Sequence, residues 1–207
     1  MDIIKSVSES QSEILNNIIR LYCPMGFELD PTYSKGNFYK DVPEPKHKLD
    51  LHPQSGDVFE ADSRRLPFNN SSVESIVFDP PFVGGSRKEG KPGIIKERFG
   101  YYKNVPILWR FYRDSLDEFF RILNPEGVLV FKCQDTIENG SQYLSHIEII
   151  NYAYSIGFYP LDLFILIANN RLMSPSQAVQ QHARKYHSYF IVFKKSKRLV
   201  DYSRAMK

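Results

Sequence analysis

The sequence predicts an α/β fold in which a mostly parallel sheet is covered by helices on both faces. Three observations predict it. Strand-length apolar segments alternate with helical segments, the strand 128–131 is apolar at every position, and an acidic residue follows each of four consecutive strands. A strand without polar alternation is typical of a parallel sheet buried on both faces. The final two strands have no predicted helix between them, so we expect the last one to pair antiparallel at one side of the sheet.

The individual elements follow from periodicity and from turn residues. Helices are predicted over about 12–21 and 107–123, where apolar residues recur at three- and four-residue steps. A third helix is predicted over about 142–155, with Asn139-Gly140-Ser141 as its cap and Gly157 at its end. Asn124-Pro125-Glu126-Gly127 is predicted to be a turn. Strands are predicted over about 26–30, up to 50–51, and over 57–61, 75–78, 128–131, 161–167 and 189–193, with a short helix leading to Lys40.

Length and composition exclude several classes of protein. The chain has 207 residues, of which 42% are hydrophobic and 25% charged, which suits one globular domain and excludes a mainly disordered chain. It contains no apolar run long enough to span a membrane, and its first residues lack the order of a signal peptide. Two cysteines, Cys23 and Cys133, exclude a disulfide framework and a multi-cysteine zinc site. We expect one domain over 1–195, a basic tail over 196–207, no metal and a cytoplasmic location.

Acidic residues mark the edge of the sheet where a ligand is expected. Ligands of open α/β sheets bind at the carboxyl ends of the strands. Asp30, Asp50, Asp62 and Asp79 follow the first four predicted strands in order. Aspartate also favours strand ends and turns for local reasons, so each residue alone is a weak signal. Because the four aspartates follow consecutive strands, they are together predicted to form one acidic site.

Two of these aspartates belong to motifs of a known family. Asp79-Pro80-Pro81-Phe82, directly after an apolar strand, resembles the catalytic tetrapeptide of the S-adenosylmethionine-dependent amino-methyltransferases, which modify adenine N6 or cytosine N4 in DNA. Upstream, the segment 30–36 resembles the family's Asp-Pro-Phe-x-Gly-x-Gly loop. The resemblance covers 26–82 by motif, and 109–193 by element order and the closing segment 187–194. It implies a Rossmann-like class I methyltransferase fold with seven strands, the last antiparallel, S-adenosylmethionine as cofactor and DNA as partner.

The resemblance also implies which residues hold the cofactor. Asp30 and the loop that follows it would contact the methionine part, Asp50 the ribose hydroxyls and Asp62 the adenine amino group. Ser34 stands where the family has its first glycine, and serine can replace that glycine only if its φ stays negative, because serine carries a Cβ. The cofactor-binding residues implied are Asp30, Pro31, Thr32, Tyr33, Gly36, Asp50 and Asp62.

The tetrapeptide suits a reaction at an exocyclic nitrogen, whose lone pair is delocalised into the base. By resemblance, Asp79 and the carbonyl of Pro80 would accept the two N–H groups and localise that lone pair, while Pro81 helps to fix their direction. Phe82 would stack on the target base once it has left the duplex. Aspartate first and phenylalanine last favour adenine N6. The alternative is that Asp-Pro-Pro is only a turn and Phe82 only part of the core.

Basic residues follow this motif directly. The net charge is only +3, but the segment 83–104 is rich in lysine and arginine, and we expect it to contact DNA. The segment 169–187, with His182 and His187, is a second candidate contact. The individual nucleic-acid contacts predicted are Arg87, Lys88, Lys91, Lys96, Arg98, Tyr101 and Tyr102.

Other functions remain open. An RNA or protein amino-methyltransferase of the same fold is one alternative, and an inactive nucleic-acid-binding homologue is another, to which Ser34 points. A cytosine-C5 methyltransferase would need a cysteine nucleophile, but Cys23 and Cys133 are interpreted as buried structural residues.

Overall fold

The computed structural model describes residues 3–82, 102–168 and 181–196. Its helices are α1 (Gln11–Tyr22), the short 3-10 helix η1 (Asn37–Tyr39), α3 (Val105–Ile122) and α4 (Ser145–Ser155). Its strands are β1 (Val7–Ser8), β2 (Leu29–Asp30), β3 (His47–Asp50), β4 (Phe59–Glu60), β5 (Val73–Phe78), β6 (Leu123–Cys133), β7 (Thr136–Glu138), β8 (Ser141–Tyr143), β9 (Phe158–Ile167) and β10 (His187–Lys195).

The predicted fold class is confirmed. The main sheet has the strand order β1-β9-β10-β6-β5-β2-β3-β4, and the pairs among β2 to β6 are parallel. As expected, the last strand is antiparallel: β10 lies between β6 and β9 and runs opposite to both. The sheet contains eight strands in place of the seven predicted, because the two-residue strand β1 pairs with the outer edge of β9.

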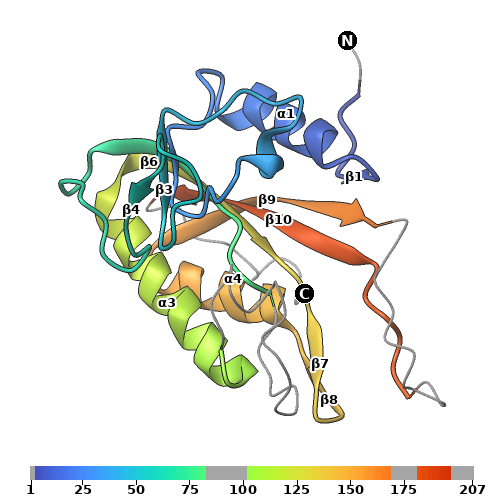
Figure 1. Cartoon of the computed structure of the whole chain (residues 1–207). Coiled ribbons are helices and arrows are strands. Elements are labelled where there is room, and N and C mark those ends of the chain that lie inside the picture. The colour runs from blue at the N-terminus through green and yellow to red at the C-terminus, as the bar shows by residue number, and fades with distance from the viewer. Residues whose placement is uncertain (1–2, 83–101, 169–180, 197–207) are drawn as a thin grey trace, which may run out of the picture.

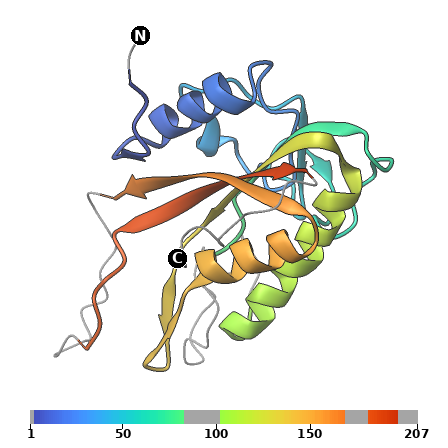
Figure 2. The same cartoon turned by 180° about the vertical axis from the view of Figure 1, so that it is seen from behind.

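Helices cover both faces of the sheet, as Figures 1 and 2 show from opposite sides. Helix α1 packs on one face, where Ile14, Leu15 and Ile18 join a buried cluster with Val130 and Phe190. Helices α3 and α4 pack on the other face in a second buried cluster. The strands alternate between these two clusters, since successive side chains of a strand point to opposite faces. The sheet is therefore held between two apolar layers, one on each face.

Local sequence sets where the first two long helices begin. The Ser10 side chain accepts a hydrogen bond from the backbone N–H of Glu13 and caps α1. Asn104 caps α3 in the same way by accepting from the backbone N–H of Ile107, and Pro106 lies in the first turn, where its missing N–H costs no helical bond. A helix boundary with such a cap can be predicted from the sequence.

Two predicted turns have a different structure. Asn139 and Gly140, expected to cap a helix, form the tip of the hairpin β7–β8, and both have positive φ. Helix α4 begins after Leu144, which makes no side-chain cap bond. The segment 124–127 lies within β6 rather than outside it, as a bulge between the pairs Val73–Leu123 and Ser75–Val128. Both segments carry turn residues, and in both the strand pairing on either side decides their role.

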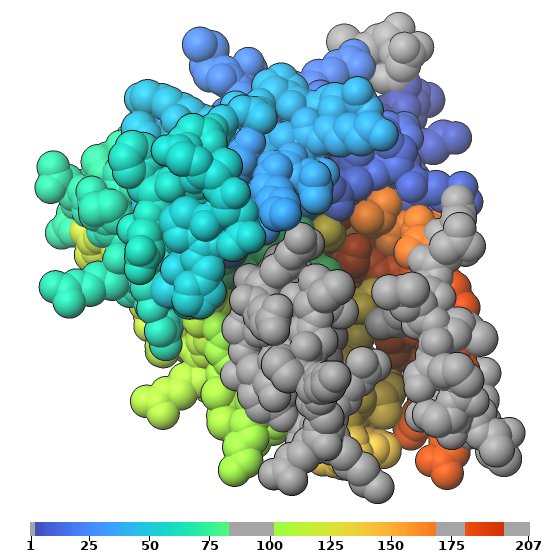
Figure 3. Space-filling model, viewed as in Figure 1, coloured from blue at the N-terminus to red at the C-terminus, as the bar shows by residue number. Residues whose placement is uncertain are grey.

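The order of the strands creates a point at which a ligand is expected. From β2 the chain proceeds to β3 and β4 in one direction, whereas from β5 it proceeds to β6 in the other, and β2 and β5 are neighbours. Such a reversal leaves a crevice at the carboxyl ends of the two strands. In the space-filling view the N-terminal third, in blue and cyan, lies above α3, in green (Figure 3). Among the described residues, no helix is long and apolar enough to cross a membrane.

Candidate active site

Thr32 joins the carboxyl ends of β2 and β5. Its backbone N–H and its hydroxyl both donate to Asp30 Oδ1, over 2.7 Å and 2.9 Å. The hydroxyl oxygen in turn accepts the backbone N–H of Asp79 over 3.0 Å. Two of the predicted aspartates, 49 positions apart in the chain, are thereby fixed to one small side chain at the reversal point.

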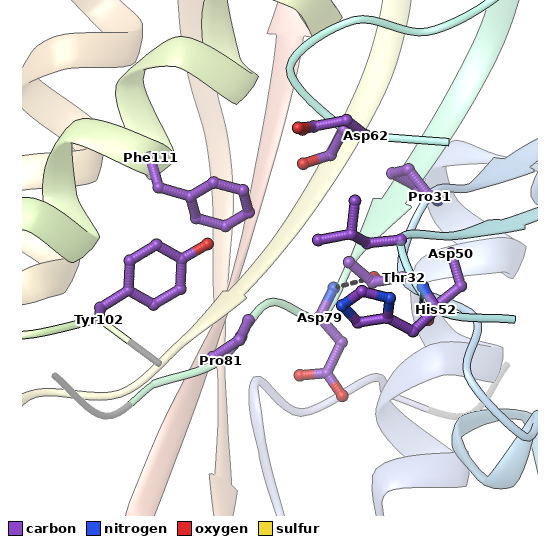
Figure 4. Close-up of a pocket in the computed structure, with 11 residues that line it drawn as sticks. Pro31, Thr32, Asp50, His52, Asp62, Asp79, Pro81, Tyr102 and Phe111 are labelled. Carbon is purple, nitrogen blue, oxygen red and sulfur yellow. Dashed lines mark hydrogen bonds between the residues drawn. The ribbon is translucent and has the colours of Figure 1, made fainter. Parts of the chain in front are cut away.

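A pocket opens beside Thr32 (Figure 4). Phe111 and Tyr102 lie on one side of it, and Pro31, Asp50 and His52 on the other. It is lined by Pro31, Thr32, Asp50, Leu51, His52, Asp62, Ser63, Asp79, Pro81, Tyr102 and Phe111. We call it the acidic pocket. Aromatic and apolar walls with a few carboxylates are typical of a site for a small polar ring compound.

Asp50 lies at the end of β3 in this pocket. Its Oδ2 accepts the backbone N–H of Ser34 over 2.9 Å, and its Oδ1 accepts that of His52 over 2.8 Å. Burial raises the pKa of Asp50 above its ordinary value, while these two N–H groups oppose the rise. Each oxygen keeps further acceptor capacity, because an ionised carboxylate can accept about four hydrogen bonds.

Asp62 has a different environment, although it lines the same pocket. Its carboxylate receives two hydrogen bonds to Oδ1 and two to Oδ2, all from Arg64. The hydrogen bonds from the Arg64 side chain lower the pKa of Asp62 below its ordinary value. The Arg64 guanidinium lies 5.8 Å from the centre of the Phe111 ring. Asp62 therefore lines the pocket as an ionised carboxylate whose charge is neutralised by Arg64.

The loop after Asp30 forms a second pocket that shares Thr32 and Asp79 with the first. It is lined by Gln11, Thr32, Tyr33, Ser34, Lys35, Asn37, Phe38 and Asp79. We call it the loop pocket. Tyr33 stacks on Tyr39 with ring centres 5.5 Å apart and donates to Glu44. A Cβ added to Gly36, at φ 71°, would lie 2.5 Å from the Tyr33 hydroxyl. The glycine is required there because no side chain fits.

Ser34 does not keep the negative φ that serine was expected to need. Its φ is +54°, in the left-handed region. The Ser34 N–H donates to Asp50, and the surrounding bonds offset a strain of about 1–2 kcal/mol. The serine therefore follows the backbone path that a glycine would take, and its effect on cofactor affinity stays a prediction.

Asp30 lies beneath the loop, outside the lining of both pockets. It is 1% exposed, and its Oδ2 accepts the Tyr39 hydroxyl over 2.7 Å. Burial raises the pKa of Asp30 from 3.8 to about 7, although the hydrogen bonds from Tyr39 and Thr32 oppose the rise. The structure thus shows Asp30 holding Thr32 and Tyr39 in place, and direct contact of Asp30 with a cofactor stays a prediction.

This raised pKa predicts how stability changes with pH. Between about pH 4 and pH 7 the folded protein keeps a proton on Asp30 that the unfolded chain has lost, so the free energy of unfolding falls as pH rises. The loss is about 1.4 kcal/mol for each unit of pKa difference. We expect the wild type to lose stability relative to Asp30→Asn across this window in urea unfolding. The contribution of Asp79 is common to both proteins, and parallel curves would contradict the prediction.

Asp79 lies between the two pockets and lines both of them. Its Oδ2 lies 3.3 Å from the Nζ of Lys132 on β6, and its side chain is 25% exposed. Burial raises the pKa of Asp79 above its ordinary value, and Lys132 opposes the rise. In Figure 4 the carboxylate points away from Phe111 and Tyr102. Asp79 is thus a negative acceptor aimed toward the loop pocket and Lys132.

The rest of the tetrapeptide is held from α3 and β6. Pro80 is buried, and the carbonyl of Pro81 accepts the hydroxyl of Tyr112 over 2.5 Å. Phe82 is partly buried, and the centre of its ring lies 5.5 Å from Lys132 Nζ. These contacts fix the direction of the segment that carries Asp79.

The structure brings most of the predicted site residues that it describes together at one edge. Pro31, Thr32, Tyr33, Asp50, Asp62, Asp79 and Pro81 line the two pockets. Tyr102, predicted to contact DNA, lies in the acidic pocket against Phe111, with ring centres 5.0 Å apart. The predicted contacts Arg87, Lys88, Lys91, Lys96, Arg98 and Tyr101 lie outside the described residues, as do 169–180 and 197–207.

Sequence reasoning missed several residues of the site, among them Gln11, His52, Phe111 and Lys132. A signal existed for two of them. Phe111 follows Leu108 by three positions, on the apolar side of α3. Lys132 is the one charge in the otherwise apolar segment 128–133. Gln11 and His52 carry no such signal.

Neither cysteine is placed to act as a nucleophile. Cys23 and Cys133 are free and buried, and burial raises the pKa of Cys23 to about 12. In the described part of the chain, no cluster of three or more histidine, cysteine, aspartate or glutamate residues is arranged to hold a metal ion.

No protein-family model matches the chain, and neither does any curated protein. Solved structures do. A proposed DNA modification methylase of Thermus thermophilus, in complex with S-adenosyl-L-methionine, is 20% identical, with 75% of this chain and 58% of that chain covered and a TM-score of 0.47. The cytosine-N4-specific PvuII DNA methyltransferase is 16% identical, with 67% and 49% covered and a TM-score of 0.48.

A SAM-dependent methyltransferase of Thermotoga maritima is 12% identical, with 88% of this chain and 86% of that chain covered and a TM-score of 0.48. The chain spans 58% of the length of the Thermus protein. At these sequence identities the similarity concerns the fold alone, so it does not identify the substrate.

Proposed function

We propose that this protein transfers the methyl group of S-adenosylmethionine to an exocyclic amino group of a DNA base, with adenine N6 favoured. The observation that carries the proposal is the position of Asp79. It is a half-buried carboxylate at the carboxyl end of β5, followed by Pro-Pro-Phe, and it borders both pockets of the reversal point.

The residues of the two pockets fit the cofactor. The acidic pocket offers Phe111 and Tyr102 as flat apolar walls for an adenine ring, and Asp50 as an acceptor for ribose hydroxyls. The loop pocket offers the loop from Thr32 to Gly36, beside Gln11, for the polar methionine part. When bound, S-adenosylmethionine supplies an electrophilic methyl group and leaves as a neutral thioether. Asp62 already accepts four hydrogen bonds from Arg64, which fills its acceptor capacity, so contact with the adenine amino group would require Arg64 to release it.

The tetrapeptide prepares the target nitrogen. Asp79 accepts one N–H of the amino group, and the carbonyl of Pro80 accepts the other, because the Pro81 carbonyl is bonded to Tyr112. Two acceptors favour a pyramidal nitrogen whose lone pair is free to take up the methyl group. The surplus amino proton then leaves the nitrogen toward Asp79, the negative group placed beside it. Phe82 stacks on the extruded base.

The basic segment 83–104 begins one residue after Phe82. Its lysines and arginines are proposed to bind the phosphates that flank the extruded base, with 169–187 as a second contact. The aspartate that begins the motif favours adenine over cytosine as the target. These assignments rest on the sequence, since most of both segments lies outside the described residues.

The proposal is tested with methyl-labelled S-adenosylmethionine and four kinds of substrate: duplex DNA, single-stranded DNA, RNA and a protein with exposed glutamine. We expect binding of the cofactor by calorimetry, and label in duplex DNA that nucleoside analysis identifies as N6-methyladenine. Label found only in RNA or only in protein would show a different class of substrate for the same methyl-transfer chemistry. Absence of cofactor binding would contradict the proposal as a whole.

A further inference from the structure

Lys132 occupies a position where an apolar residue is expected. On β6, Val128, Val130 and Lys132 point to the α1 side of the sheet, and the first two are part of its apolar cluster. Lys132 is 9% exposed and lies opposite Phe190 of β10. Burying an ammonium group costs several kcal/mol, and buried ion pairs are often no more stabilising than apolar residues of the same size. Fold stability alone therefore does not account for a lysine here.

The contacts of Lys132 converge on Asp79. Its Nζ donates to Gln11 Oε1 over 2.9 Å and to Asp79 Oδ2 over 3.3 Å. Nζ also lies 5.0 Å to 5.5 Å from the ring centres of Phe38, Phe82 and Phe190. These five partners come from four different parts of the chain, so the ammonium is held in one position. An ammonium carries three N–H groups, and within the described residues two of them have a hydrogen-bond acceptor.

We propose that Asp79 and Lys132 act together as an acceptor–donor pair that recognises an amino group and the acceptor atom next to it. This inference rests on the proposed function and specifies its target. Asp79 accepts the amino N–H, and the remaining N–H of Lys132 donates to the neighbouring ring nitrogen.

The pair fits some bases and rejects others. Adenine presents its N6 amino group beside the N1 lone pair, and cytosine presents its N4 amino group beside N3. Thymine has no amino group and presents only carbonyl oxygens, which the Asp79 carboxylate would repel. Guanine presents O6 beside N1–H at the equivalent place, and has an amino group next to a ring acceptor only at N2 and N3. A simple alkylamine has no adjacent acceptor for Lys132. The ring of Phe82, which lies beside Nζ and outside the lining of the loop pocket, is suited to stack on a planar base at this point.

The pair also favours the ionised form of Asp79, whose pKa burial raises and Lys132 lowers. Lys132 on β6 is the cation beside it, whereas Asp30 on β2, Tyr39 of η1 and Tyr112 of α3 face it without positive charge. Loss of Lys132 leaves the carboxylate without its counter-ion, so its pKa rises further. Because the ionised form is the stronger acceptor of the amino N–H, the acid limb of the rate profile should move to higher pH in Lys132→Met.

The deciding experiment removes the ring acceptor from the substrate. Two duplexes carry either adenine or 1-deazaadenine at the methylated position, and kcat/KM is measured for the wild type, for Lys132→Met and for Lys194→Met. Lys194 is a matched control, since it lies on β10 and pairs with Glu126, away from both pockets. Where cytosine is the methylated base, 3-deazacytosine serves the same purpose.

We expect the wild type and Lys194→Met to lose about 10- to 100-fold on 1-deazaadenine, the range for a hydrogen bond to a charged group. Lys132→Met should lose a similar factor on adenine and little more on 1-deazaadenine. The wild-type comparison needs no variant, so a Lys132→Met protein that fails to fold does not prevent the test. Equal wild-type rates on both duplexes would overturn this inference alone. A wild type that methylates no DNA would overturn the proposed function, and this inference with it.

Discussion

Replacing Asp79 with alanine is expected to lower single-turnover methyl transfer by about two to three orders of magnitude, or roughly 3–4 kcal/mol of barrier, by analogy with the loss of one preorganised polar group in other active sites. The reason is that Asp79 is the negative acceptor at the reversal point, next to the place where positive charge develops on nitrogen. Affinity for S-adenosylmethionine should stay nearly unchanged, because Asp50 and the loop after Asp30 do not depend on the Asp79 side chain. The measurement is transfer of label to duplex DNA.

The contact between Asp79 and Thr32 makes this substitution a clean test. Thr32 accepts the backbone N–H of Asp79, which alanine retains. Asp117→Ala is the matched control, since this carboxylate on α3 is bonded to Tyr152 outside both pockets. A folded Asp79→Ala protein that methylates DNA at the wild-type rate would remove the main support for an amino-methyltransferase.

Asp30→Ala is expected to have the second largest effect, on both stability and cofactor binding. The substitution removes the acceptor of three hydrogen bonds, a buried one from Tyr39 and two partly buried ones from Thr32, and leaves a small cavity. We expect a loss of about 2–4 kcal/mol in the free energy of unfolding. Affinity for S-adenosylmethionine should fall as well, because Thr32 and the loop pocket lose their anchor.

The unfolding measurement belongs at about pH 4, the lower end of the window in which the wild type loses stability. The pKa of Asp30 is about 7 in the folded protein, so its carboxyl group is protonated there, while the unfolded chain has only partly lost this proton, and the pH-dependent loss of stability is therefore small. Asp57→Ala is the control, since this exposed aspartate pairs with Lys48 in the same part of the chain and should change stability by less than about 0.5 kcal/mol. Unchanged stability together with unchanged cofactor affinity in Asp30→Ala would show that the loop does not depend on this residue.

The sequence predicted the elements and the acidic edge well for a physical reason. Periodicity, capping and proline act over a few residues, so the strand before Asp79 and the helices α1 and α3 were visible without any tertiary information. Asp30, Asp50, Asp62 and Asp79 meet at one edge because parallel strands all end on the same side of a sheet. Once the fold class is known, their proximity follows.

The tertiary structure alone decided how those residues are partnered. Lys132 and Asp79 lie 53 positions apart and meet only because β5 and β6 are neighbours. Asp30 and Asp79 have the same side chain and both follow strands, yet hydrogen bonds from Tyr39 and Thr32 surround one and a lysine the other. The left-handed Ser34 depends likewise on Asp50, from a different strand. A local sequence pattern fixes which groups reach the edge, whereas the charge and direction of each group depend on contacts between distant segments, which only the packed sheet brings together.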